Sequence, residues 1–166
     1  MKPDRPPLIH FAGVRELYLH FERIFLGSSG FGEINISCGH HIKIFDHHFF
    51  HMVKFDEPNK AKPLLMANEK ALILSTELGF GTYTHDKQRA IYLESARSCL
   101  AGPDEIWEDH TLNSATWVYI KEFNAKPYAF TITLVGKRED SLVPVTSFPG
   151  KKRDAERRRR GQRIYP

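Results

Sequence analysis

The stretch TWVYIKEFNAKPYAFTITLVGKREDSLVPVTSF, residues 116–148, decides the fold. It contains three runs rich in β-branched and aromatic residues, at 116–123, 128–135 and 142–148, which is the composition that strands favour. The spacers between them, NAKP and GKRED, are short and contain the residues typical of hairpin connections. The stretch therefore predicts an antiparallel meander of three strands.

Helical patterns precede this meander. Apolar residues within Ile9–Phe25 recur at three- and four-residue spacing, and a second such pattern ends at Gly102. Between them, residues 33–45 alternate in part and favour a strand or hairpin, and Asp46 stands where it can cap a short helix over residues 47–55. Because helices come first and strands last, the fold class is predicted to be α+β.

The length and composition predict one soluble domain over residues 1–166. No apolar run approaches the length of about 20 residues that a membrane span needs, and the amino terminus lacks the pattern of a secretory signal. The two cysteines, Cys38 and Cys99, make neither a disulfide framework nor a four-thiolate zinc site. We therefore expect a cytoplasmic protein.

The positive charge is concentrated near the carboxyl end. The segment KKRDAERRRR, residues 151–160, has seven basic and two acidic residues, a net +5, whereas the whole chain has +4. It is either a solvated basic helix or tail, or a patch that binds nucleic-acid phosphates. On the second interpretation the substrate contacts come from the four adjacent arginines, Arg157, Arg158, Arg159 and Arg160.

Five of the nine histidines lie within Cys38–Phe55, and three interpretations of them remain open. A zinc site is one, because His47 and His51 are spaced i, i+4 and His40 offers a further ligand. A catalytic site is the second, with His51 as general base and Lys54 as a phosphate contact. The third is an ordinary core with imidazoles at its rim.

The second half of the chain resembles a known group of nucleases. The helix RAIYLESARSCLAG, followed by PDEIW, YIKEF and TSFP, is similar to the phage-associated branch of the barnase–EndoU–colicin–RelE group, over residues 83–166. The resemblance implies helices before an antiparallel sheet of about four strands, and ribonuclease activity without metal or other cofactor. Members are frequently toxins or phage-delivered effectors. Residues 1–75 do not match the pattern and are expected to form an amino-terminal extension.

The resemblance also implies a site. The group uses a helix histidine, basic residues on helix or strand, and a hydroxyl near the end of the sheet, and these fall on His85, Arg89, Lys121, Thr146 and Ser147. Metal-independent RNA cleavage needs a base, an acid and cations that stabilise the phosphorane. Histidine suits both proton roles because its ordinary pKa, about 6.5, lies near neutrality.

The residue pattern supports some of these roles and leaves alternatives. His85 and Arg89 share a helical face near a helix start, where a phosphate can bridge them, or His85 only caps the helix and Arg89 pairs with a surface acid. Lys121 shares a strand face with Trp117 and Tyr119, in an arrangement that suits a stacked base and its phosphate. Alternatively, Lys121 protects an edge strand from aggregation.

Thr146 and Ser147 are adjacent on a strand and must face opposite sides, so at most one of them lines a given cleft. The sequence as a whole predicts a metal-independent endoribonuclease of a phage or mobile element, with His51 and His85 sharing acid–base duties. Its expected partners are RNA and an immunity or antitoxin protein. The alternatives are a non-catalytic RNA- or partner-binding module on the same fold and a zinc-dependent enzyme that uses the histidine cluster.

Overall fold

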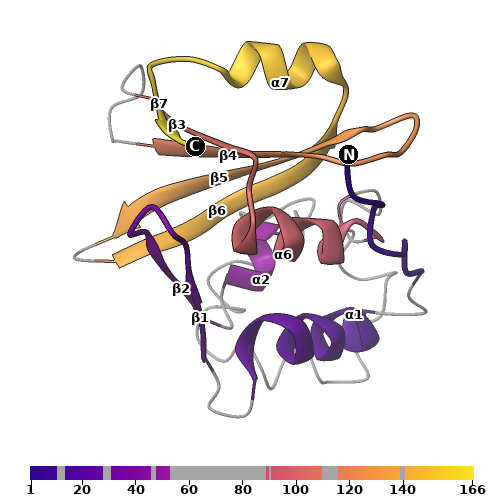
Figure 1. Ribbon diagram of the computed structural model, residues 1–166. Coiled ribbons are helices and arrows are strands. Elements are labelled where there is room, and N and C mark those ends of the chain that lie inside the picture. Colours follow the sequence, from indigo (N-terminus) through magenta and orange to yellow (C-terminus); the bar gives the residue numbers. More distant parts are fainter. Residues whose placement is uncertain are drawn as a thin grey trace, which may run out of the picture.

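A computed structural model describes residues 1–10, 14–27, 31–45, 48–52, 89, 91–109, 116–138 and 141–166. In these residues the chain forms helices, a single sheet and a short π-helix, η1 (Figure 1). In chain order the elements are α1 (Val14–Phe21), η1 (Glu22–Leu26), β1 (Phe31–Asn35), β2 (His41–Phe45), α2 (His48–Met52), α6 (Leu93–Ala101), β3 (Glu105–Asp109), β4 (Thr116–Glu122), β5 (Phe130–Arg138), β6 (Ser141–Gly150), α7 (Lys152–Arg158) and β7 (Gln162–Tyr165).

The sheet has seven described strands in the order β1-β2-β6-β5-β4-β3-β7. Adjacent strands in the sheet are antiparallel except β2 and β6, which are parallel and pair at Ile42 and Leu142. The α+β class is therefore confirmed, and so are the predicted meander of β4, β5 and β6 and the hairpin of β1 and β2. The expected count of about four strands is wrong.

Two strands that the sequence analysis did not predict, β3 and β7, have weak local signals. β3 reads EIWED, with three carboxylates in five residues, and β7 reads QRIY at the end of the chain. Each becomes a strand because it pairs along its length, β3 with β4 and β7 with β3. Strand formation depends on cross-strand neighbours more than on intrinsic preference, so these two strands need the tertiary structure to appear.

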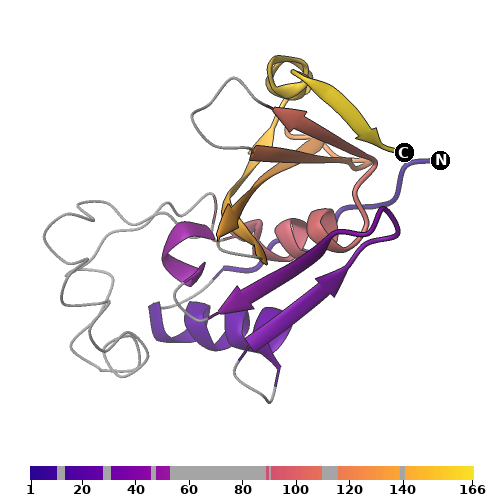
Figure 2. The same ribbon diagram turned by 90° about the vertical axis from the view of Figure 1, so that its left-hand side faces the viewer.

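Helices cover both faces of the sheet. α6 and α2 lie against one face, with α1 beyond them, and α7 lies alone across the other (Figures 1 and 2). We call these the α6 face and the α7 face. The amino-terminal segment runs beside the β4–β5 turn, where the backbone N–H of Asn124 donates to the carbonyl of Pro3 at 2.8 Å.

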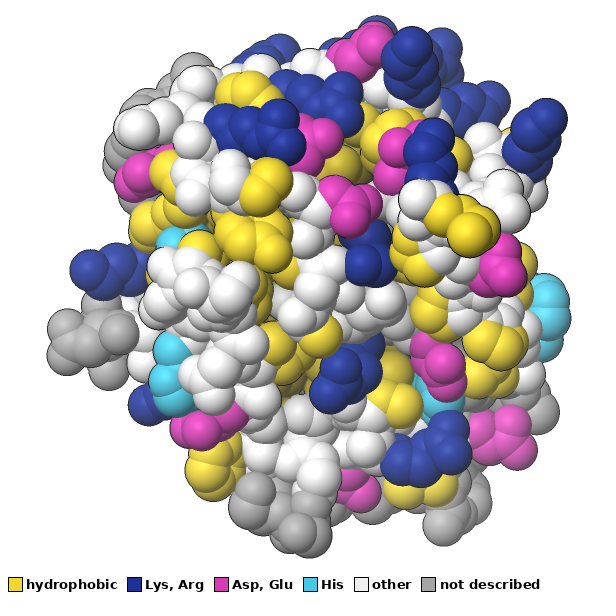
Figure 3. Space-filling model, viewed as in Figure 1, with side chains coloured by type: hydrophobic (Ala, Val, Ile, Leu, Met, Phe, Trp, Pro, Cys, Tyr) yellow, Lys and Arg dark blue, Asp and Glu magenta, His cyan; other side chains and the backbone are white. Residues whose placement is uncertain are grey.

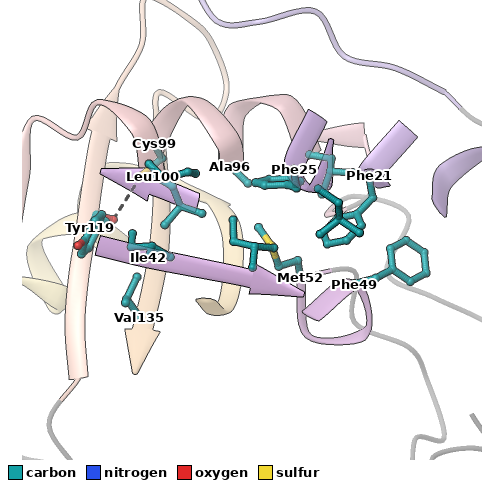
Figure 4. Close-up of a cluster of buried hydrophobic side chains, with 14 of the residues drawn as sticks. Phe21, Phe25, Ile42, Phe49, Met52, Ala96, Cys99, Leu100, Tyr119 and Val135 are labelled. Atoms are coloured by element: carbon teal, nitrogen blue, oxygen red, sulfur yellow. Dashed lines mark hydrogen bonds between the residues drawn. The ribbon is translucent and has the colours of Figure 1, made fainter. Parts of the chain in front are cut away.

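The main core fills the α6 face (Figure 4). Aromatic residues of α1, η1 and α2 pack at one end, with Phe49 within 5.4 Å of Phe21 between ring centroids. At the other end Leu100 and Cys99 of α6 pack on the sheet, and the Cys99 thiol donates to the carbonyl of Tyr119 at 3.5 Å. This core joins the hairpin of β1 and β2 to the carboxyl-terminal strands. Among the described residues, no helix is long and apolar enough to cross a membrane.

A smaller core lies on the α7 face. Val118, Ile120, Phe130 and Ile132 of the sheet are buried there together with Ala155 of α7, and Phe148 is partly buried against them. Because side chains alternate along a strand, Ile132 and its neighbour Thr133 point to opposite faces. The basic segment predicted from the sequence is thus a helix with one apolar contact surface.

Among the described strands, β6 has one edge that is largely unpaired, and this open edge positions the site described next. β2 pairs with β6 only at Leu142, near the start of β6, and the described residues provide no further partner on that side. Pro144 and Pro149 are compatible with β6 because proline, which has no N–H to donate, is confined to strand edges. Among the described residues, the part of β6 after Leu142 thus has no strand partner on that edge, although α2 packs against β6.

Candidate active site

Two arginines, a threonine and a phenylalanine meet at the open edge of β6. Arg89 donates a hydrogen bond from a terminal guanidinium nitrogen to Thr146 Oγ1 at 2.6 Å. Its guanidinium carbon lies 5.6 Å from the ring centroid of Phe148, and that of Arg158 lies 5.6 Å from the same centroid. The two guanidinium groups are thus no further apart than twice that distance. We call these four residues the Phe148 cluster.

Local structure explains why these side chains converge. Thr146 and Phe148 are two residues apart on β6, so they share the α7 face. Arg158 occupies the last turn of α7, which crosses that face, and Arg89 lies one turn before α6 and reaches the open edge of β6. Two consecutive elements, β6 and α7, and a residue 57 positions before Thr146 therefore contribute to one cluster.

The chemistry of the Phe148 cluster suits a phosphate group. Each guanidinium has five N–H donors in a fixed plane and matches phosphate oxygens in pairs. The aromatic ring holds both cations through cation–π contacts, and the Thr146 hydroxyl can accept from Arg89 while it donates elsewhere. The four side chains, all partly exposed, thus provide two cations and one hydroxyl.

Ser147 and Lys121 lie on the α6 face, away from this cluster. Ser147 is 4% exposed, and its hydroxyl shares a 2.8 Å hydrogen bond with the hydroxyl of Thr133. Lys121 donates from Nζ to the carbonyl of Gly102 and borders an open pocket of about 440 Å³ that is also lined by Arg97. The structure therefore brings Arg89 and Thr146 together, and the sheet separates them from Ser147 and Lys121.

The two aromatic residues expected to stack on a base are also on the α6 face. Tyr119 is fully buried, its hydroxyl is hydrogen-bonded to Nδ1 of His40, and burial raises the pKa of the Tyr119 phenol. The ring centroid of Trp117 lies 5.7 Å from that of His40 in an edge-on arrangement. Burial lowers the pKa of His40. Tyr119 thus exposes no ring surface to a ligand.

The four adjacent arginines have different surroundings. Arg158 belongs to the Phe148 cluster. Arg159 forms a bidentate ion pair with Glu105, in which Nη2 donates to Oε1 at 2.8 Å and Nε donates to Oε2 at 2.9 Å. Burial opposes ionisation of Glu105, but hydrogen bonds from Arg159 and Trp107 outweigh it and hold the pKa of Glu105 below its usual range. Arg157 and Arg160 are exposed. The run is thus divided between inward and outward side chains.

Several predicted positions lie outside the described residues. His85, Lys54 and His47 are among them, and His51 lies within α2 while its side chain is not described. Within the described part of the chain, no group of three or more histidine, cysteine, aspartate or glutamate side chains is arranged to hold a metal ion. The proton-transfer roles of His51 and His85 stay predictions.

Two residues of this region were not singled out from the sequence. Phe148 follows Thr146 by two positions, so the alternation rule that grouped Lys121 with Trp117 would also have grouped these two. Glu105 lies in the PDEIW segment, but its pairing with Arg159 spans 54 residues and has no local signal.

Comparison with known proteins places the chain in a family. No curated protein and no solved structure matches the chain significantly. A family model, described as phage-Barnase-EndoU-ColicinE5/D-RelE like nuclease2, matches residues 52–166 and so includes the Phe148 cluster, α6, α7 and strands β3–β7. Because the match covers more than half of the chain, the protein belongs to this family of phage-associated, barnase–EndoU–colicin–RelE-like nucleases.

Proposed function

We propose that the protein is a metal-independent endoribonuclease of a phage or mobile element, acting as a toxin or effector on RNA in the cytoplasm. The proposal is supported by the family membership and, above all, by one observation, the convergence of Arg89 and Arg158 on the ring of Phe148 beside the Thr146 hydroxyl. A phosphorane formed from RNA is stabilised by fixed cations and a hydrogen-bond donor placed around its negatively charged oxygens.

In the proposed reaction the 2′-hydroxyl of one nucleotide attacks the adjacent phosphorus, and the bond from phosphorus to the 5′-oxygen of the next nucleotide breaks. Arg89 and Arg158 hold the non-bridging oxygens, whose charge grows as the phosphorane forms. Thr146 donates a hydrogen bond to one of these oxygens while its own oxygen accepts from Arg89. The base that takes the 2′-hydroxyl proton and the acid that protonates the 5′-oxygen are assigned to His51 and His85 on the sequence pattern.

The test is cleavage of single-stranded RNA by the purified protein in excess EDTA. We expect Arg89→Ala and Arg158→Ala each to lower kcat/KM by about 100-fold to 1000-fold, as loss of a preorganised donor to a developing oxyanion does. Thr146→Val should lower kcat with little change in stability, because the hydroxyl is lost and the volume is nearly kept. A melting curve for each variant separates loss of activity from loss of structure.

Ser147→Ala is the matched control. It removes a hydroxyl one residue away from Thr146 but on the opposite face, where the group bonds Thr133. It should cost about 1 kcal/mol of stability and leave kcat/KM unchanged. If the wild type leaves RNA intact while binding it in a salt-dependent way, the protein is instead a binding module. If EDTA abolishes cleavage and zinc restores it, the zinc-dependent alternative replaces the proposal.

A further inference from the structure

The outer surface of α7 carries a row of cations that the Phe148 cluster does not use. Ala155 is fully buried against the sheet, so the opposite side of the helix faces solvent. Arg153 and Arg157 are exposed on that side at i, i+4 spacing, and the exposed Arg160 follows just beyond the helix end. We call these three residues the α7 ridge. Lysine and arginine side chains gather along this part of the surface (Figure 3).

α7 is held firmly enough to present the ridge as a fixed surface. At its start the Asp154 carboxylate accepts from the backbone N–H of Lys151 at 2.8 Å, which is one of the two hydrogen bonds of a capping box. Beyond its end Arg159 is clamped by Glu105. The chain then turns at Gly161, which has φ +77°, and continues as β7 along β3.

The turn at Gly161 leaves no room for a side chain at this position. A Cβ at this position would lie 2.0 Å from the carbonyl oxygen of Glu108, so the backbone of the connection lies directly on β3. Contacts on both sides thus fix the ends of α7, and the ridge arginines project from a helix whose direction is set by the sheet.

We propose that the α7 ridge binds backbone phosphates of the RNA that flank the bond to be cleaved; this inference rests on the proposed ribonuclease function. Four helical residues advance about 6 Å, a spacing comparable with that of successive phosphates in a single strand. Arg158 belongs to the same helix as the ridge and also to the Phe148 cluster, so a strand held at the cluster lies beside the helix that carries the ridge.

Charge and position favour RNA over other polyanions. The ridge has three cations, and the exposed acid of α7 beside them is Glu156. An acidic inhibitor protein would also complement this charge. Binding of such a protein does not explain why the ridge shares its helix with a cluster that suits a phosphate group, whereas binding of RNA does. The ridge would contribute to the affinity for long RNA through counterion release and would not contribute to the chemical step.

The experiment measures binding and cleavage separately. Binding of an uncleavable single-stranded 2′-O-methyl RNA is titrated over a range of salt for the wild type and for R153Q/R157Q/R160Q. Each phosphate contact in a single strand contributes about 0.7 to the slope of log K against log salt, so the slope should fall by about 2 and the affinity at low salt by about tenfold or more. Cleavage of a dinucleotide, which is too short to reach the ridge, should keep its kcat/KM.

A second triple variant, K43Q/K137Q/R138Q, controls for net charge. It removes the same charge from β2 and from the carboxyl-terminal end of β5. Its salt slope should match that of the wild type. An unchanged slope in the ridge variant, or an equal loss in both variants, overturns the inference, as does a ridge that binds an acidic protein and leaves RNA affinity unaffected. If the wild type leaves long single-stranded RNA intact in excess EDTA while the ridge variant alone loses RNA binding, the ribonuclease proposal fails, and the ridge is then a phosphate-binding surface with no cleaved bond to flank.

Discussion

The ion pair between Glu105 and Arg159 should stabilise the protein measurably, and its contribution should depend on pH in a defined direction. The two side chains are 14% and 28% exposed and make two parallel hydrogen bonds. Exposed pairs contribute about 0–1 kcal/mol, whereas removing one partner of a buried pair costs about 3–5 kcal/mol. Because this pair lies between those limits, we expect a coupling free energy of about 2 kcal/mol at neutral pH.

The pH dependence follows from the direction of the pKa shift. The pKa of Glu105 is lower in the folded protein than its ordinary value, so the folded state binds the proton less readily than the unfolded chain does. The pair therefore stabilises the protein fully above the ordinary glutamate pKa, and this contribution is lost as the pH falls through the folded-state pKa. In Arg159→Gln, Glu105 stays partly buried but loses the charged hydrogen bonds from Arg159 that stabilise its carboxylate, so the pKa of Glu105 should rise.

The assay is a double-mutant cycle of Glu105→Gln, Arg159→Gln and the double variant, with urea unfolding at neutral pH and again below the ordinary glutamate pKa. The pair of Lys2 and Glu122 is the control, because its side chains are 58% and 31% exposed and its coupling should stay below about 0.5 kcal/mol. A Glu105–Arg159 coupling as small as that of the control, or one that grows on acidification, would refute the reasoning.

Two further predictions concern the backbone and the thiols. Gly161→Ala should lower stability by more than about 2 kcal/mol, because strain at φ +77° adds to a backbone clash, whereas Gly39→Ala, at φ +92° with open space around it, should cost only about 1–2 kcal/mol; urea unfolding of both variants measures the difference. Burial raises the pKa of Cys99 to about 12, so iodoacetamide should modify the partly exposed Cys38 in the native protein and Cys99 only in denaturant, which mass spectrometry can resolve. Rapid native labelling of Cys99 would contradict the packing of α6 on the sheet.

Local pattern was sufficient for the elements with strong periodicity. The alternation of 116–148 predicted β4, β5 and β6 and their antiparallel order, and Gly102 correctly marked the end of α6. Hairpins joined by short turns need only local information, because pairing partners are neighbours in sequence. The same alternation correctly separated Thr146 from Ser147.

The sequence by itself thus determined the α+β class, the carboxyl-terminal meander and the concentration of positive charge near the end of the chain, since all three depend on neighbouring residues. Only the tertiary structure decided that Arg89, Thr146 and Arg158 meet at Phe148, and that Lys121 lies on the other face of the sheet. The physical reason is that a strand face is assigned by what packs on it: α1 and α2, from the other end of the chain, contribute to the core on one face, and Arg89 reaches Thr146 across 57 residues of sequence.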